Sequence, residues 1–323
     1  MKIKALQIAA VTATFIAGAL TAVAAFEGLW WWPYLVAQFR IQIALGTLAV
    51  AMVLGVSRRT RSAAVLCLIF ALCNATYFMP AFFPNGNHPQ TVGAKAHPLS
   101  VLMLNVNNKN ERFVDAIKYV ESVNPDVLVV SELTPDWETA FAQMHGFKYS
   151  WTVPRLDTYG IAVYSKKKML NPRTEYYGKS GHPSIVCQLD TLPKRVTLLH
   201  THVQGPIKLP HYEWQKEQFK IMTLEASKLP KPLILTGDMN STPWTHMLAG
   251  LARKSELLDT RNGFGLQLSW PAPMIWRKTP LVLLPIDHCF VSEEFVVRDR
   301  DVGPFFGSDH YPVLVSLALQ SER

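Results

Sequence analysis

Carboxylate, amide and imidazole side chains recur in this sequence at the ends of short apolar runs. Asn105 and Asn107 stand two residues apart at the end of one run, and Glu132 follows the next. His200 and His202 repeat the spacing of two at the end of a third run. Because side chains at i and i+2 of a strand lie on one face, each pair can act on a shared ligand.

Further acids, bases and amides flank three later apolar runs. Asp238 and Asn240 follow the run that ends at Thr236. An acid and a base stand together at 287–288, where the next run opens, and at 309–310, before the last run. Each group alone has a plain explanation, because Asn and Asp are common turn formers at strand ends. Together they supply what phosphoryl transfer needs, namely cation ligands, donors to phosphate oxygens and a proton acceptor.

The kind of cation follows from the donor types. The imidazoles of His200 and His202 could bind zinc, but no third ligand has zinc-like spacing. The neighbouring candidates are oxygen donors, which suit Mg²⁺ or Mn²⁺ better. His200 lies one residue pair deeper in its run than His202, so we expect a hydrogen-bonded strand histidine there. No role is predicted for His182, which lies in a polar context.

In this order along the chain, the motifs resemble those of the endonuclease/exonuclease/phosphatase superfamily, which includes AP endonucleases, DNase I, neutral sphingomyelinases and inositol polyphosphate 5-phosphatases. The resemblance covers residues 99 to about 318. The motifs are Asn-x-Asn at 105–107, Glu132, Thr-His at 201–202, Gly-Asp-x-Asn at 237–240, Ile-Asp-His at 286–288 and Ser-Asp-His at 308–310. The resemblance implies a DNase I-like α/β fold, a four-layered sandwich of two mixed sheets flanked by helices, with the site at a sheet edge.

The resemblance also implies which residues bind the metal and the substrate. Glu132 is expected to be the principal metal carboxylate, with Asp309 near the ion. Asn107 belongs to the same set, although many relatives have Asp at its position, and a single Mg²⁺ or Mn²⁺ is expected. Asn105 lies near the ion and, with Asn240, is expected to bind the substrate phosphate.

Four further positions carry the catalytic roles that the resemblance implies. Asp238 is expected to orient or deprotonate the attacking water, and His202 to donate to a non-bridging phosphate oxygen. His310, paired with Asp287, is expected to act at the phosphate as a base or as a stabiliser of developing charge. An acid that fixes the tautomer of an imidazole lets it work near neutral pH. His288 is expected to support the site from behind Asp287.

The elements that must position these residues alternate between strands and helices. Apolar runs bounded by turn residues predict strands at 100–106, 126–131, 160–165, 184–189, 195–201, 232–236, 286–291 and 313–319. Helical patterns intervene at 112–123, 135–144, 212–227 and 244–252. This alternation predicts a layered α/β domain. Motifs of the GxGxxG, GxxxxGK and GxSxG types are missing from the strand-to-helix junctions, which disfavours dinucleotide binding, P-loop and serine-hydrolase chemistry.

The first 83 residues have a different composition and predict a membrane anchor. Apolar stretches at about 5–26, 35–56 and 62–83 are each long enough to cross a hydrocarbon core of about 30 Å. We therefore expect three transmembrane helices, then a linker at 84–98 and the catalytic domain at 99–323. Arg40 is expected to extend toward the membrane interface. The alternative for the first stretch is a cleaved signal peptide.

Charge is distributed unevenly along the chain. Before residue 97 there are seven Lys or Arg and one acid, whereas the rest has 25 basic and 23 acidic residues. The positive-inside rule then places Lys2, Lys4 and the loop at 58–61 in the cytoplasm, and the catalytic domain outside a bacterial inner membrane. The near-neutral remainder disfavours a general nucleic-acid surface, which needs clustered cations.

These observations predict a multi-pass membrane enzyme that hydrolyses a phosphate ester with Mg²⁺ or Mn²⁺. The substrate stays open between a lipid head group at the membrane surface and extracytoplasmic DNA or RNA. A different alternative is a sensor or scaffold that keeps the fold without turnover, but Glu132 and His310 are both present. A Cys187–Cys289 disulfide in an oxidising compartment also stays open.

Overall fold

A computed structural model describes residues 2–84, 97–272 and 283–320. Most of the predicted linker therefore lies outside the described residues. The chain divides into two compact units. One comprises Met1–Pro80 with Pro243–His246, and the other comprises Ala81–Thr242 with Met247–Arg323.

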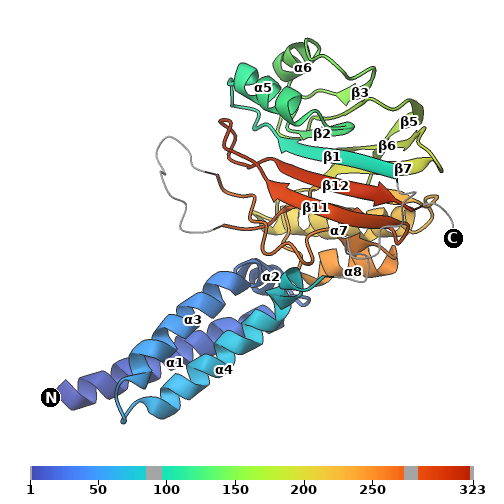
Figure 1. Ribbon diagram of the computed structural model, residues 1–323. Coiled ribbons are helices and arrows are strands. Elements are labelled where there is room, and N and C mark those ends of the chain that lie inside the picture. The colour runs from blue at the N-terminus through green and yellow to red at the C-terminus, as the bar shows by residue number, and fades with distance from the viewer. Residues whose placement is uncertain (1, 85–96, 273–282, 321–323) are drawn as a thin grey trace. The chain divides into compact units, whose positions relative to one another are not determined.

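The first unit is built from apolar helices (Figure 1). These are α1 (Lys2–Ala25), α2 (Trp31–Gln38), α3 (Arg40–Gly55) and α4 (Arg61–Phe78), with a 3-10 turn at Met79–Phe82. Two segments, Gln7–Ala25 and Arg61–Phe82, are long and apolar enough to cross a membrane, and α2 with α3 makes a third if the bent pair is one span. The span predicted at 35–56 falls on this pair, which is two helices with a bend of 67° between them and not one unbroken helix.

Arg40 lies at this bend, and its expected extension toward the interface is wrong. Its side chain is 1% exposed within the first unit. Nη2 donates to the Ala24 carbonyl at 2.7 Å, and Nη1 lies 3.4 Å from Asn74 Oδ1. The guanidinium stacks on Tyr77 at 3.5 Å from the ring centroid. The charged group is thus in contact with a helix carbonyl, an amide and an aromatic face.

The second unit contains two six-stranded sheets in its described residues, ordered β11-β12-β1-β2-β4-β3 and β5-β6-β7-β8-β10-β9. The first sheet consists of β1 (His97–Asn105), β2 (Val127–Ser131), β3 (Tyr149–Val153), β4 (Ile161–Ser165), β11 (Phe295–Val302) and β12 (Val313–Leu319). The second consists of β5 (Met169–Tyr176), β6 (Pro183–Leu189), β7 (Val196–His202), β8 (Leu233–Asp238), β9 (Leu258–Asp259) and β10 (Asp287–Val291). The β1–β2 and β7–β8 pairs are parallel and the others antiparallel, so both sheets are mixed.

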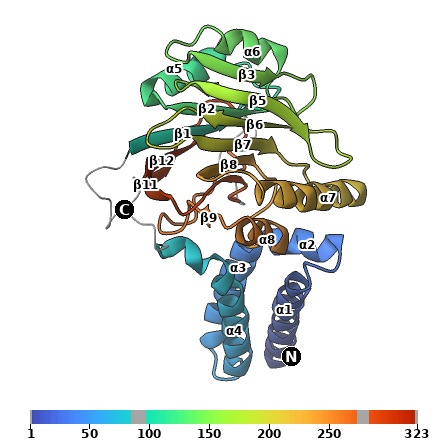
Figure 2. The same cartoon turned by 90° about the vertical axis from the view of Figure 1, so that its right-hand side faces the viewer.

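The sheets pack face to face, because alternate residues of each central strand are apolar on the inner side. Val101 and Val129 of the first sheet meet Leu198 and Ile234 of the second in one buried cluster. Helices cover the outer faces (Figure 2). On the first sheet these are α5 (Phe113–Val123) and α6 (Pro135–Phe141), and on the second α7 (Leu209–Ala226) and α8 (His246–Lys254). The predicted four-layered DNase I-like architecture is confirmed.

A disulfide between Cys187 and Cys289 is excluded by this topology. The two thiols are free and buried. They lie on β6 and β10, which are separated by β7 and β8. Three interstrand steps of about 4.8 Å exceed the Cα separation of about 7 Å at which a disulfide can still form.

Candidate active site

Strand direction brings the polar motifs to one edge of the second unit. In the second sheet, His202 at the end of β7 is the register partner of Asp238 at the end of β8. Asp287, the first residue of antiparallel β10, is also a partner of Asp238. Three adjacent strands therefore present His202, Asp238 and Asp287 in one row, and the side chains are 2–4% exposed.

The first sheet contributes the other half of the site through β1 and the loop before β12. Ser308 Oγ donates to the carbonyl of Asn105 at 2.6 Å and accepts from the His310 amide at 3.0 Å. Gly307 permits this close approach, since it has a φ of +108° and an added Cβ would lie 2.5 Å from Asn110 Oδ1. The loop is thus fixed to the end of β1, and His310 faces the row on the second sheet.

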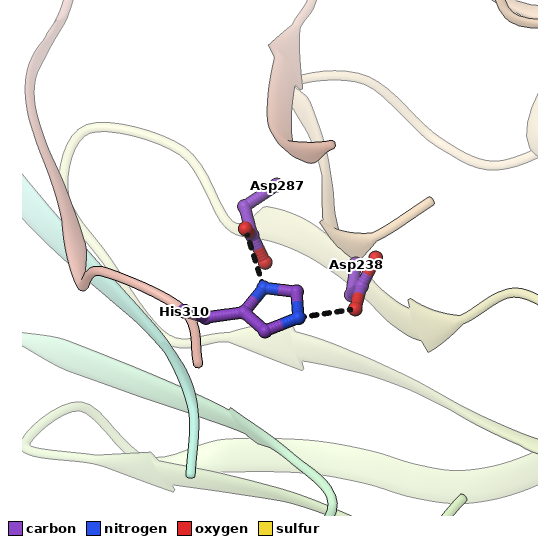
Figure 3. Close-up of side chains that lie close together, drawn as sticks. All are labelled: Asp238, Asp287 and His310. Carbon is purple, nitrogen blue, oxygen red and sulfur yellow. Dashed lines mark hydrogen bonds and ion pairs between the residues drawn. The ribbon is translucent and has the colours of Figure 1, made fainter. Parts of the chain in front are cut away.

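His310 lies with its two ring nitrogens toward two carboxylates (Figure 3). Nδ1 is 2.9 Å from Asp287 Oδ2, and Nε2 is 3.6 Å from Asp238 Oδ2. Burial alone would lower the pKa of His310, but the two facing carboxylates outweigh it and raise the pKa above its usual value. Burial raises the pKa of Asp238, whereas the pKa of Asp287 is lowered because His310 outweighs the effect of burial there. The arrangement favours an imidazolium held between two acids.

Ligand atoms of Asp238, Asp287 and His310 all lie within 4.8 Å of one another, a spacing that could also hold a metal ion. A cation bound there would displace the proton from His310 Nε2, because a metal ligand must offer an unprotonated imidazole nitrogen. Without a cation, the three side chains form a proton-bearing relay.

Glu132 provides the alternative position for a cation. Its carboxylate accepts from Asn105 Nδ2 through Oε1 at 3.1 Å and from the Asn108 amide through Oε2 at 3.0 Å. Asn105 Nδ2 also donates to Asp238 Oδ2 at 3.0 Å, which joins Glu132 to the relay. Glu132 has a φ of +63°, a conformation that is uncommon and costly for a residue with a side chain. Such strain at a carboxylate is typical of a functional position.

Asp309 completes this side of the site together with Asn107. Asn107 Nδ2 donates to Asp309 Oδ1 at 2.6 Å, and the backbone N–H of Asn107 donates to Asn105 Oδ1 at 3.0 Å. Trp270 Nε1 donates to the second Asp309 oxygen at 3.2 Å. Sequence reasoning missed Trp270, because it lies in a loop outside every recognised motif and nothing distinguishes it from the other eight tryptophans.

His202 and Asn240 form a neutral pair beside the relay. Asn240 Nδ2 lies 3.1 Å from His202 Nε2 and donates to the Val203 carbonyl at 2.9 Å. The Asn240 amide donates to Asp238 Oδ1 at 2.9 Å, in a turn where Asn240 has a φ of +47°. Burial lowers the pKa of His202 to about 4, so the ring is neutral near pH 7.

Two histidines of the motifs lie outside this cluster. His200 is 1% exposed, and its ring nitrogens lie 2.9 Å from the Val130 carbonyl and 3.2 Å from the Thr236 carbonyl. It links the two sheets, as expected for a satisfied strand histidine. His288 is fully buried with Nε2 2.9 Å from the Ser241 carbonyl, and as the next residue after Asp287 it faces the other side of β10.

The donor set fits a hard divalent cation. Four carboxylates converge within the described residues of the site, those of Glu132, Asp238, Asp287 and Asp309. Among the motif histidines of these residues, only His310 has a raised pKa, whereas burial lowers the pKa of the other three. Excess negative charge, carboxylate and amide oxygens and no free thiolate are the conditions that favour Mg²⁺ or Mn²⁺.

Comparison with protein families gives an independent result. Residues 104–310 match the profile of the Endonuclease/Exonuclease/phosphatase family. This range contains every motif described above, from 105–107 to 308–310. A comparison with curated protein sequences finds no match.

Solved structures share the fold of the second unit. Bacteroides thetaiotaomicron mannosyl-6-phosphatase is 18% identical with a TM-score of 0.56, covering 68% of this chain and 99% of that one. D. rerio TDP2 complexed with a single-strand DNA product is 15% identical with a TM-score of 0.58, covering 68% and 98%. The catalytic domain of human Nocturnin with bound sulfate is 16% identical with a TM-score of 0.55, covering 69% and 95%. At these identities the likeness is evidence for the fold alone.

Proposed function

We propose that this chain, which belongs to the Endonuclease/Exonuclease/phosphatase family, hydrolyses a phosphoric ester with Mg²⁺ or Mn²⁺ at a membrane surface. Enzymes of this family hydrolyse phosphate esters and generally depend on divalent metals. The observation that carries the proposal is the convergence of Glu132, Asp238 and His310 from both sheets at one edge of the second unit. Asn105 connects the first two, with Nδ2 3.1 Å from Glu132 and 3.0 Å from Asp238, while His310 Nε2 lies 3.6 Å from Asp238.

The cation is assigned to the side of the site that holds Glu132 and Asp309, with the amide oxygens of Asn105 and Asn107 nearby. When bound there, it would neutralise charge on the phosphate and on the attacking and leaving oxygens. Glu132 is the principal ligand, because its carboxylate is partly exposed at the end of the central strand β2 and its backbone holds the uncommon φ of +63°.

The proton acceptor for the attacking water is Asp238. Its burial raises the pKa, so its carboxylate takes up a proton more readily than an exposed aspartate does. The backbone N–H of Asn240 donates to Asp238 Oδ1 and Asn105 Nδ2 donates to Asp238 Oδ2, and these two hydrogen bonds fix the orientation of the carboxylate. In the reaction the water oxygen forms a bond to phosphorus and the water proton passes to Asp238. The bond from phosphorus to the alcohol oxygen breaks, and the alkoxide that leaves takes a proton from solvent.

His310, His202 and Asn240 supply donors for the phosphoryl oxygens. The His310 imidazolium, held by Asp287, offers positive charge where negative charge develops in the transition state. Asn240 Nδ2 and Nε2 of the neutral His202 ring lie 3.1 Å apart on the neighbouring strand end, and a phosphate oxygen that replaces this mutual contact would accept a hydrogen bond from each. Phosphoryl transfer asks a protein mainly for such positioning and charge stabilisation.

Activity of the full chain in detergent micelles tests the proposal. We expect Mg²⁺-dependent release of nitrophenol from p-nitrophenyl phosphate or bis(p-nitrophenyl) phosphate, lost in EDTA and restored by added Mg²⁺. Glu132→Gln should abolish the release, whereas Glu121→Gln, at an exposed position on α5, should leave it unchanged. Equal rates in EDTA, or in Glu132→Gln, would overturn the assignment.

A substrate panel then separates the classes of ester. Phosphatidylinositol phosphates and sphingomyelin in mixed micelles represent lipid head groups, and single- and double-stranded DNA represent nucleic acids. The near-neutral charge of the second unit and the membrane helices of the first favour a lipid head group. Faster hydrolysis of DNA than of every lipid would refute that preference.

Placement outside the cytoplasm is part of the same proposal. It is supported by Lys2, Lys4 and the basic loop at 58–61, since short loops rich in Lys and Arg stay in the cytoplasm. A C-terminal fusion to alkaline phosphatase, which is active only outside the cytoplasm, should be active, and a fusion to green fluorescent protein dark. The reverse result would place the catalytic unit inside.

A further inference from the structure

Tyr159 contacts the active-site histidine His202 but belongs to none of the motifs. It lies in the loop between β3 and β4, directly before the buried Gly160. Its ring centroid is 4.9 Å from that of His202, at an interplanar angle of 42°. The aromatic ring therefore touches the imidazole that is assigned to a phosphate oxygen.

The same ring is itself held by His182. The two centroids are 3.4 Å apart and the planes are 13° from parallel, so the rings stack. His182 is 6% exposed and lies next to the first residue of β6. Burial lowers the pKa of His182 to about 4, which makes the stacked imidazole neutral near pH 7.

Hydrogen bonds connect His182 back to His202 through two glutamines. His182 Nε2 lies 2.8 Å from Gln204 Oε1 and is the donor, because Gln204 Nε2 donates to the Gly205 carbonyl. The backbone N–H of Gln204 donates to Gln218 Oε1 at 3.0 Å. Gln218, on α7 and fully buried, reaches the His202 carbonyl through Nε2 at the long distance of 3.5 Å. The ring contacts and hydrogen bonds thus lead from His202 through Tyr159, His182, Gln204 and Gln218 back to the carbonyl of His202.

We propose that Tyr159 is a positioning residue for the reaction, holding the His202 ring in the orientation in which Nε2 faces Asn240 and the phosphate. The proposal rests on the proposed function of the site. His202 is the last residue of β7, and polar contacts hold only the Nε2 edge of its ring, from Asn240 Nδ2 at 3.1 Å and Asp238 Oδ2 at 3.4 Å. The ring of Tyr159 adds an aromatic contact to the same imidazole. His182 and Gln204 in turn fix the ring of Tyr159.

A plain packing role makes a different prediction, and Tyr164 provides the comparison. Tyr164 lies five residues further, in β4, and is 6% exposed. It packs in the outer cluster with Phe141 and Phe147. Loss of its ring should lower stability without any connection to His202.

A double-mutant cycle on the full chain in detergent separates the two roles. Tyr159→Leu should lower kcat for a nitrophenyl ester about 10- to 100-fold with little change in KM, since small misplacement of a catalytic group has such effects. In a His202→Ala background the same change should lower kcat by less than about twofold, because contacting residues are not additive. Tyr159→Phe keeps the ring and should retain activity within about threefold of the unchanged protein.

The control and the overturning results follow from the same cycle. Tyr164→Leu should lower the melting temperature and have the same effect on kcat with or without His202. The proposal is overturned if Tyr159→Leu lowers kcat equally in both backgrounds, or if Tyr159→Leu retains the full rate.

A spectroscopic readout makes the result independent of turnover. With ¹⁵N-labelled histidines, the His202 ring signals should be sharp in the unchanged protein and in Tyr159→Phe, and broadened or doubled in Tyr159→Leu. If the unchanged protein hydrolyses no ester, the proposed function fails, and the ring signals still decide the role of Tyr159. Identical His202 signals in all three proteins would refute it.

Discussion

Replacement of Asp287 by Asn tests how far the reaction depends on the charge of the relay. The substitution keeps the side-chain volume and an oxygen that can accept from His310 Nδ1, but it removes one negative charge. At an effective dielectric constant of about 20, unit charges at the observed separation of 2.9 Å interact by about 6 kcal/mol. The His310 imidazolium keeps its second partner, Asp238, whose carboxylate oxygen lies 3.6 Å from Nε2.

The amide dipole of Asn replaces part of the lost attraction, so we expect a net loss of about 3–5 kcal/mol in the transition state, which is a fall in kcat of about 10²- to 10⁴-fold. KM should change little, because Asp287 does not face the substrate directly. The measurement is steady-state hydrolysis of a nitrophenyl ester by the full chain at saturating Mg²⁺, with the melting temperature recorded to establish folding.

Asp259→Asn is the matched control. Asp259 lies on β9 in the same sheet, is also largely buried and pairs with Arg261 at 3.3 Å. Its loss should lower stability and leave kcat within about threefold, since charges that do not contact the site contribute little to the chemistry. If folded Asp287→Asn kept kcat within that same range, or if Asp259→Asn slowed the reaction equally, the relay argument would be refuted.

Three further outcomes follow from the same structure. Glu132→Gln should raise the Mg²⁺ concentration for half-maximal binding at least about tenfold, because it removes the charge of the principal ligand. Isothermal titration calorimetry measures this, and an unchanged affinity would contradict the metal assignment. Burial lowers the pKa of His200 to about 4, below its unfolded value of about 6.5, so its contribution to stability is present above pH 6.5 and is lost as the pH falls toward 4. Relative to His200→Gln, the protein should lose about 2 kcal/mol between pH 7 and pH 5 in denaturant titrations, and parallel pH profiles would refute this. Gly160→Ala should prevent folding or lower stability by more than about 3 kcal/mol, seen as loss of the folded fraction in size-exclusion chromatography, because the new Cβ would lie 1.9 Å from the Leu133 carbonyl.

The central strands were predictable, and the edge strands were not. All eight predicted strands are present, and the four that were missed, β3, β5, β9 and β11, are the outermost strands of the two sheets. Edge strands are partly solvated and tolerate polar residues, so they lack the continuous apolar run that marks a buried strand. β5 contains Asn171 and Pro172 beside a register shift, and β11 alternates arginine with aspartate at 298–301.

The motif residues of the site were predictable for a topological reason. Parallel strands end at one edge and antiparallel strands begin there, so residues as distant as Asn105, Asp238 and His310 meet. Tyr159 and Trp270 were not predictable, because they come from loops whose paths depend on tertiary packing rather than on a local pattern. Loop positions carry no periodic signal.

Interactions between helices in the first unit were equally hidden. The apolar stretch at 35–56 has the length and composition of one helix, and nothing in it marks a bend at Phe39. Burial of Arg40 depends on Ala24 and Asn74, which lie 16 and 34 residues away along the chain. A charged residue near the end of an apolar stretch fits an interfacial position equally well when only the sequence is considered.

Anomalous scattering of Mn²⁺ in crystals of the full chain grown with inorganic phosphate tests most directly where the cation and the phosphate bind. We expect a single strong peak bonded to the Glu132 carboxylate, with phosphate oxygens within hydrogen-bond distance of Asn240, His202 and His310. A peak held instead between Asp238, Asp287 and His310, or a phosphate bound away from these residues, would contradict it.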